Sequence, residues 1–148
     1  AAAAETVVPA RLAPLFDAYR VFYERASDPS AARAFLEQRL QRDESVVFVA
    51  EESAGNAVGF AQIFPSFSSV SLARILVLND LFVDPGARRR GVARALLVAT
   101  CEQARACGAV RVSLATAVSN APARRLYEAF GFELDKAFDH YHWYPRPS

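Results

Sequence analysis

The sequence predicts a mixed α/β domain in which helices cover both faces of one sheet. Stretches with apolar residues at helical spacing alternate with stretches rich in β-branched residues, and glycine, proline and asparagine separate them. The order is two helices, three strands, a helix, a strand, a helix and a final hairpin, which is typical of a layered α/β domain. With 148 residues the chain can bury a substantial core, and we expect one domain over residues 1–148.

The first half of the chain predicts two helices and a β-hairpin. Asp28 and Pro29 suit the cap and the first turn of the second helix. Pro65 indicates a strand end, a bulge or a sheet edge in the second strand. The expected ranges are helices over 10–25 and 27–42 and strands over 45–52 and 57–67.

The second half begins with the longest apolar run, which predicts a central strand that is buried on both faces over much of its length. A long amphipathic helix ends at Gly108, and a shorter one has Asn120 as its cap and Gly131 as its stop. The expected ranges are strands over 72–83 and 110–116, helices over 91–108 and 120–131, and one or two strands over 132–145.

Composition and charge argue against several classes of protein. The net charge of +1 gives no strong overall field for nucleic acid. The sequence has no apolar run of membrane-spanning length, and its first residues lack a signal-peptide pattern. Cys101 and Cys107 point in different directions on one predicted helix, and His140 and His142 have no nearby ligands to complete a metal site. We therefore expect no metal, no nucleic acid and no membrane partner, and a cytoplasmic location.

The stretch "DPGARRRGVARAL" concentrates positive charge where a helix begins. The first backbone N–H groups of a helix have no internal partner and, with the helix dipole, form an anion site. Gly91 allows close approach of a bulky anion, Ala93 keeps the next turn slim, and the arginines can add charge-assisted hydrogen bonds. The strand–loop–helix context favours a pyrophosphate over a merely solvated basic loop. Neither a dinucleotide fingerprint nor a Walker loop is present.

Two motifs in this region resemble the signatures of the GNAT superfamily of N-acetyltransferases. Its acetyl-CoA loop, Arg/Gln-x-x-Gly-x-Gly/Ala, is matched by Arg88, Gly91 and Ala93. The second signature, in "SNAPARRLYEAFGF", is matched at Asn120, Ala123, Tyr127, Gly131 and Phe132. The resemblance is strong from Asn79 to Phe132, and the chain is most similar to the branch of Hpa2-type histone and polyamine acetyltransferases.

The resemblance implies a mostly antiparallel mixed sheet with a splayed pair of parallel strands that forms the acetyl-CoA slot. The pantetheine arm would pair with the backbone of Leu81, Phe82 and Val83. The pyrophosphate would rest on the backbone of the loop formed by Arg88, Arg89, Arg90, Gly91, Val92 and Ala93, and Asn120 and Tyr127 complete the expected cofactor site. Acetyl-CoA is then a co-substrate, and a homodimer is expected.

The resemblance also implies direct attack by the amine, without an acetyl-enzyme. Tyr127 matches the tyrosine that lies near the cofactor sulfur, where a phenol can donate a proton to the departing thiolate. A backbone N–H near Phe82 or Val83 is the expected oxyanion donor. Some relatives carry Glu-Asp where this chain has Asn79-Asp80, so a direct carboxylate base is in doubt. Asp80 acting through water is the first choice; Glu51, His140 and His142 are alternatives.

The acceptor pocket is expected between the first two helices and the final hairpin, with aromatic walls and acidic groups that attract a cationic amine. The candidates are Tyr19, Phe22, Tyr23, Phe64 and Phe67 for the walls and Asp17, Glu24 and Asp28 for the charges. The expected activity is acetyl transfer to a primary amine of a small molecule. The alternatives are a protein lysine acetyltransferase, a catalytically silent acyl-CoA-binding module and, least favoured, a nucleic-acid-binding protein.

Overall fold

The computed structural model describes residues 8–52 and 55–147. They fall into two compact units, one within residues 1–115 and one within residues 116–148. The first unit contains the whole sheet and the helices α1, α2 and α3, and the second contains α4 and the C-terminal segment.

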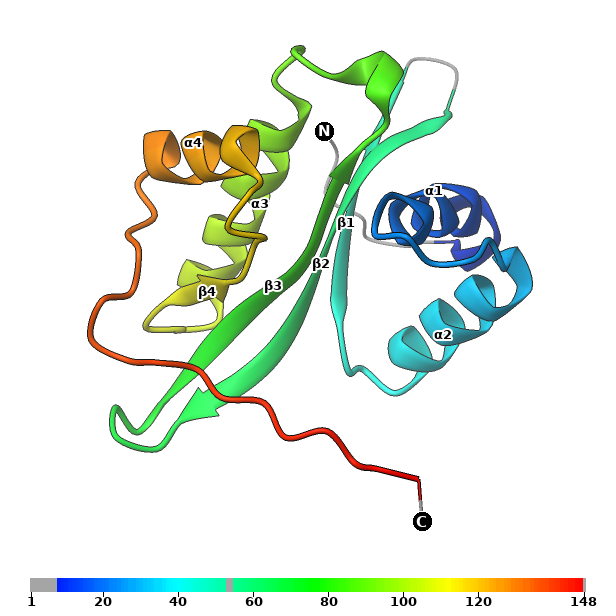
Figure 1. Ribbon diagram of the computed structural model, residues 1–148. Helices are drawn as coiled ribbons and strands as arrows, with labels where there is room; N and C mark the ends of the chain where they lie inside the picture. Colours follow the sequence, from blue (N-terminus) through cyan, green and yellow to red (C-terminus); the bar gives the residue numbers. More distant parts are fainter. Residues whose placement is uncertain (1–7, 53–54, 148) are drawn as a thin grey trace. The chain divides into compact units, whose positions relative to one another are not determined.

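The sheet has four strands in the order β1-β2-β3-β4 (Figure 1). The strands β1 (Val46–Glu51), β2 (Ala57–Ser68) and β3 (Ala73–Val83) form an antiparallel meander. The short strand β4 (Val112–Leu114) pairs with β3 in parallel. The predicted mixed, mostly antiparallel sheet is thereby confirmed. Pro65 lies on β2 beyond the last residue that pairs with β1, so it occupies an edge, as expected.

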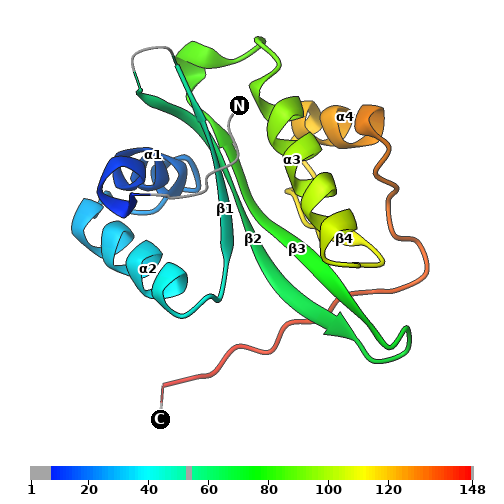
Figure 2. The same cartoon turned by 180° about the vertical axis from the view of Figure 1, so that it is seen from behind.

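Helices cover both faces of this sheet, as Figures 1 and 2 show. The helices α1 (Pro9–Phe22) and α2 (Pro29–Gln41) lie on one face, and α3 (Val92–Ala106) lies on the other. The core beneath α1 and α2 is made of apolar side chains from both helices and three strands: Leu12, Leu15, Phe16, Ala32, Leu36, Val47, Val49, Phe60 and Phe82. Their burial is the main term that holds these layers together.

Two carboxylates fix the junction between α1 and α2. Asp17 accepts hydrogen bonds from Ser27 Oγ at 2.6 Å and from the Asp28 backbone N–H at 2.7 Å. These bonds favour the charged form and hold the pKa of Asp17 below its ordinary value. Asp28 caps α2 by accepting from the Ala31 N–H, as predicted. Both groups, expected to attract a substrate amine, therefore serve the helix junction.

A β-bulge changes the direction of β3. The register runs from Gln62↔Asp80 directly to Ile63↔Leu78, so Asn79 is an extra residue on β3. The parallel ladder to β4 covers only Leu76–Leu78. Beyond the bulge, β3 has no partner in β4, which is the geometry expected of a splayed parallel pair.

The second unit contains α4 (Ala121–Phe130). Asn120 caps it by accepting from the Ala123 N–H, and Gly131 ends it with a left-handed φ of 118°. The cap and stop predicted from the sequence are both confirmed.

The predicted strands over 132–145 are wrong, because residues 132–147 contain no strand. The Asp135 side chain accepts hydrogen bonds from the backbone N–H groups of Ala137 and Phe138, which makes a turn in the middle of the expected strand. The acceptor pocket expected at the final hairpin accordingly lacks that wall among residues 132–147.

Candidate functional site

The loop before α3 presents backbone N–H groups at a helix N-terminus. A short 3₁₀ turn, η1 (Pro85–Ala87), leads into it, and α3 begins at Val92. Gly91 occupies the cap position with a left-handed φ of 75°, and no side chain caps the helix. A Cβ atom on Gly91 would meet no atom within 4 Å, so described residues do not fill the space beside it. This combination fits an anion such as a pyrophosphate.

Close packing at Gly59 brings this helix terminus to the end of β3. Gly59 pairs with Val83, and a Cβ atom added to it would lie 2.9 Å from Val92 Cγ1 and 3.2 Å from the Phe82 carbonyl oxygen. Only glycine allows the first turn of α3 to approach β2 this closely. The expected phosphate loop and the expected pantetheine strand are therefore neighbours.

The three arginines of the loop have different surroundings. Arg88 Nε donates to the Val83 carbonyl at 3.1 Å, and its guanidinium lies 5.9 Å from the ring centroids of both Phe22 and Phe82. Arg90 faces the Glu52 carboxylate at 3.7 Å. Arg89 is exposed, with a left-handed φ of 64°. The structure thus places Arg88 against the end of β3 and the other two at the surface.

The end of β3 runs beyond the ladder to β4, which stops at Leu78, and on that side the Val83 carbonyl accepts from Arg88 Nε. The Asp84 N–H donates to the Val58 carbonyl at 2.8 Å, so Asp84 faces β2. Because the direction alternates along a strand, Phe82 also faces β2, whereas Leu81 and Val83 direct their N–H and C=O groups away from it. Of the two expected oxyanion donors, this geometry favours Val83 over Phe82.

Asp80 lies at the bulge with its carboxylate enclosed by donors. Its side chain is 5% exposed. It accepts from Gln62 Nε2 at 2.6 Å, from Asn79 Nδ2 at 2.9 Å and from the side chain of Tyr19. Burial disfavours the charge more than these three bonds favour it, so the pKa of Asp80 lies above its ordinary value. Such a carboxylate binds a proton more readily than a free one, which suits a proton acceptor.

Aromatic rings extend from this carboxylate to the surface. The Tyr19 ring packs edge-on against Phe60 and Phe82, with centroids 5.5 and 5.8 Å away. Phe22 and Tyr23, at the end of α1, are 53% and 47% exposed, and Phe22 lies 6.0 Å from Phe82. Three of the five expected pocket walls therefore adjoin the Asp80 region.

The other expected pocket and base residues of this unit lie elsewhere. Phe64 lines a separate open groove of about 510 Å³ together with Phe35 and Arg39. Phe67 is exposed beneath the Arg74 guanidinium. Glu51 is exposed at the end of β1.

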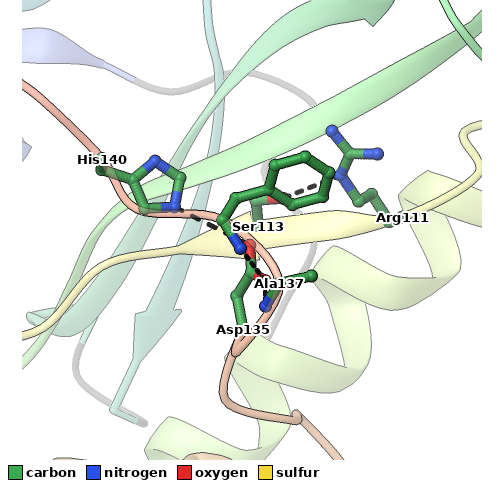
Figure 3. Close-up of polar contacts among 6 residues, drawn as sticks. Arg111, Ser113, Asp135, Ala137 and His140 are labelled. Carbon is green, nitrogen blue, oxygen red and sulfur yellow. Dashed lines mark hydrogen bonds and ion pairs between the residues drawn. The ribbon is translucent and has the colours of Figure 1, made fainter.

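Tyr127 and His140 belong to the second unit. Tyr127 is half-buried on α4 and packs edge-on against Phe132, with centroids 5.8 Å apart. His140 is exposed, and its Nε2 lies 3.8 Å from Asp135 Oδ2. Figure 3 draws this pair. The same figure draws a contact within the first unit, in which Arg111 Nε donates to Ser113 Oγ on β4 at 3.2 Å.

Sequence reasoning missed the hydrogen bonds from Gln62 and Tyr19 to Asp80. The signal for Gln62 was present, because it is the single strongly polar residue within the apolar stretch "AVGFAQIF" of a predicted strand. A glutamine at a core position needs a partner, and a buried carboxylate on the next strand is one.

No group of three or more His, Cys, Asp or Glu side chains gathers in residues 8–52 and 55–147 in a way that could hold a metal ion. No described helix is long and apolar enough to span a membrane.

Sequence relatives support the same family as the two motifs. An uncharacterized N-acetyltransferase of Bacillus subtilis, YhfO, is 49% identical over 138 residues, which cover 93% of this chain and 92% of that protein. The D-amino-acid N-acetyltransferase HPA3 of Saccharomyces cerevisiae is 27% identical over 126 residues, 82% of this chain and 77% of that protein. The second match agrees with the resemblance to the Hpa2-type branch.

Solved structures support the fold. The crystal structure of a probable acetyltransferase has a TM-score of 0.87 and 43% identity, and it covers 93% of this chain and 91% of its own. The aminoglycoside acetyltransferase AAC(6')-Iy, bound to a bisubstrate analogue that contains CoA and acetylneamine, has a TM-score of 0.72 and 25% identity over 90% of this chain and 92% of its own.

The family model described as the acetyltransferase (GNAT) family matches residues 12–132, most of the chain. The chain therefore belongs to the GNAT family of N-acetyltransferases.

Proposed function

We propose that this acetyltransferase transfers the acetyl group of acetyl-CoA to a primary amine of a small molecule by direct attack. The observation that carries the proposal is the position of Asp80. A buried carboxylate with a raised pKa lies on β3, the strand that extends beyond the β4 ladder and, with the adjacent N-terminus of α3, would bind acetyl-CoA. A carboxylate there can take the proton that an alkylammonium must lose before it attacks.

Residues of the first unit would bind the pyrophosphate, the pantetheine arm and the reacting carbonyl of acetyl-CoA. The uncapped N–H groups at the start of α3, with Gly91 before them, would hold the pyrophosphate. Leu81 and Val83 would pair with the pantetheine arm, and Arg89 and Arg90 would add positive charge at the surface of the loop. The N–H of Val83 would stabilise the oxyanion of the tetrahedral intermediate.

Tyr127 would complete the reaction by protonating the departing thiolate, since a phenol with a pKa of about 10 is a suitable donor. Asn120, which caps α4, would help to place Tyr127 through the helix start. Asp80 would accept the proton of the ammonium through water. No metal and no cysteine nucleophile enters this scheme.

The proposed acceptor is a small amine. HPA3 acts on D-amino acids, and the AAC(6')-Iy complex joins CoA to an acetylated aminoglycoside fragment, as their names state. The exposed rings of Phe22 and Tyr23 beside the Asp80 region can contact the body of such an amine and its cationic head.

We further propose that the protein is a single acetyltransferase domain, that it is located in the cytoplasm and that it forms a homodimer. The two free thiols, Cys101 and Cys107, suit a reducing compartment. Several large side chains of residues 134–144 are exposed, and a second chain could cover them: Leu134, Phe138, Tyr141, Trp143 and Tyr144.

A thiol-release assay tests the function. Acetyl-CoA is incubated with spermidine, D- and L-amino acids, neamine or a lysine-containing peptide, and the acetylated product is identified by mass spectrometry. We expect CoA release with at least one small amine and little without amine. Release with the peptide alone would favour a protein lysine acetyltransferase. Tight acetyl-CoA binding without turnover would favour a catalytically silent module.

A further inference from the structure

One buried oxygen next to Asp80 has no hydrogen-bond partner. Gln62 is 0% exposed, and its Nε2 donates to Asp80 Oδ2 at 2.6 Å. Its Oε1 is buried and unpartnered within residues 8–52 and 55–147. A buried carbonyl oxygen without a donor costs free energy, so the site is suited to a donor that binds there.

The chemistry of the carboxylate fixes which way the amide points. An ionised carboxylate only accepts hydrogen bonds, so Gln62 must present its NH₂ group to Asp80. Its carbonyl oxygen then lies on the other arm of the same amide, close to the carboxylate. Two acceptors, one charged and one neutral, are thereby adjacent on the face of the sheet that carries Phe60.

We propose that Gln62 is a positioning residue that orients the water through which Asp80 removes the proton of the acceptor ammonium. Gln62 Oε1 and the Asp80 carboxylate each accept one hydrogen of that water. The water oxygen then keeps a lone pair for an N–H of the ammonium. This inference rests on the proposed function and names a residue that prepares its first step.

The proton transfer balances. An N–H bond of the ammonium breaks and its proton goes to the water oxygen, while the water passes the hydrogen that it shares with Asp80 to the carboxylate. Water is regenerated, Asp80 becomes a neutral acid, and the amine gains the electron pair that attacks the thioester. The nitrogen attacks the thioester carbon, and the carbonyl electron pair moves to oxygen, so the C–N bond forms in a tetrahedral intermediate. When the C=O double bond re-forms, the C–S bond breaks; the nitrogen passes its second proton to solvent, and the departing sulfur takes a proton from Tyr127.

The groups that face Asp80 explain why an amide side chain is suited to position 62. Tyr19 is the titratable group that reaches the carboxylate from α1, and the uncharged amides of Gln62 and Asn79 reach it from β2 and β3. Asn79 is exposed and donates to the other carboxylate oxygen. Among the three donors, Gln62 combines a bond to the carboxylate with a buried unpartnered acceptor.

The test replaces Gln62 with methionine, which has similar length but neither the donor nor the acceptor of the amide. Thiol release is measured against pH with acetyl-CoA and spermidine, or with D-phenylalanine or neamine if either is turned over faster. We expect the acidic limb of kcat/KM to move up by about one pH unit, because the charged form of Asp80 loses a hydrogen bond. The plateau should fall at least about tenfold, because the water is no longer oriented.

Two control variants separate the roles. Asn79→Ala removes a donor to the same carboxylate but leaves Gln62 Oε1 in place, so the acidic limb should move while the plateau stays. Ser45→Ala removes another buried oxygen without a partner, at a position before β1, and should change neither. If Gln62→Met unfolds, Gln62→Asn, which shortens the same amide, should shift the limb and lower the plateau in the same direction.

Titration of the Asp80 carboxyl carbon by ¹³C NMR needs no substrate. The pKa of Asp80 should be higher in folded Gln62→Met than in the wild type. Equal titration curves, or an unchanged plateau in an active Gln62→Met enzyme, would overturn the proposal. If the wild type acetylates no amine of the panel, the proposed function fails. The NMR titration tests this inference separately, because it is refuted when the pKa of Asp80 is the same in Gln62→Met and in the wild type.

Discussion

At the scale of single residues, Asp80 is a position where stability and activity oppose each other. Burial of its charge costs free energy, which three hydrogen bonds offset only in part. In Asp80→Asn the charge is removed, and Gln62 can rotate to present its carbonyl oxygen to the new amide. We expect a melting temperature at neutral pH that is equal to or above that of the wild type, with kcat/KM lower by about 100-fold or more. Calorimetry and the thiol-release assay measure the two quantities.

A drop in both quantities would show that Asp80 is needed for folding rather than for proton transfer. Full activity in a folded Asp80→Asn protein would remove Asp80 from the mechanism.

Tyr127 is the second residue whose proposed role can be tested, here by removing one atom, its hydroxyl oxygen. Tyr127→Phe removes the hydroxyl and keeps the ring that packs against Phe132. Because an acid acts on the departing thiolate and not on bound acetyl-CoA, kcat should fall about 10²-fold or more while the Kd of acetyl-CoA changes little. Equal losses in kcat and in affinity, the latter measured by calorimetry, would contradict the acid role.

At the scale of elements, α3 has a glycine beyond each of its ends, and the two form a matched pair for mutation. Gly91 before the helix and Gly108 after it have φ values of 75° and 72°, and a Cβ atom on either meets nothing within 4 Å. Alanine at either position should lower the free energy of unfolding by about 1 kcal/mol, because both need the left-handed conformation. Only Gly91→Ala should also raise the KM of acetyl-CoA, severalfold, since only this glycine adjoins the proposed phosphate site.

Thermal unfolding and acetyl-CoA saturation curves of the two variants measure both effects. A KM that rises equally in Gly108→Ala would mean that general loosening of α3, and not the loop, weakens acetyl-CoA binding.

Most elements could be predicted from the sequence because local signals define them. Asp28, Asn120 and Gly131 act where the capping rules place them, and the apolar run over 72–83 became β3. The segment over 132–145 could not be predicted, because a strand depends on a partner elsewhere in the chain, whereas the turn at Asp135 is local.

The same distinction applies to the site. The proposed phosphate loop is a local motif, so spacing within one segment is enough to predict its residues. The surroundings of Asp80 depend on a bulge that pairs Gln62 with it and on a helix that brings Tyr19 to it. No spacing rule within one segment reports either contact.

At the scale of the whole molecule, two aspartates whose pKa values shift in opposite directions affect how stability depends on pH. The pKa of Asp17 lies below the ordinary value of 3.8, so its contribution to stability is present above that pH and is lost as pH falls through its folded pKa. The pKa of Asp80 lies above 3.8, so its contribution is present at low pH and is lost as pH rises through its folded pKa.

The difference in melting temperature between Asp80→Asn and the wild type should therefore grow as pH rises from about 4 towards neutrality, because only the wild type must bury a new charge over that range. Asp17→Asn should show the opposite trend, with a deficit that shrinks as pH falls towards the folded pKa of Asp17. Thermal unfolding of the three proteins across this range measures both trends. A constant offset for Asp80→Asn would mean that Asp80 titrates alike in the folded and unfolded chains, and the proton acceptor proposed for catalysis would lose its physical basis.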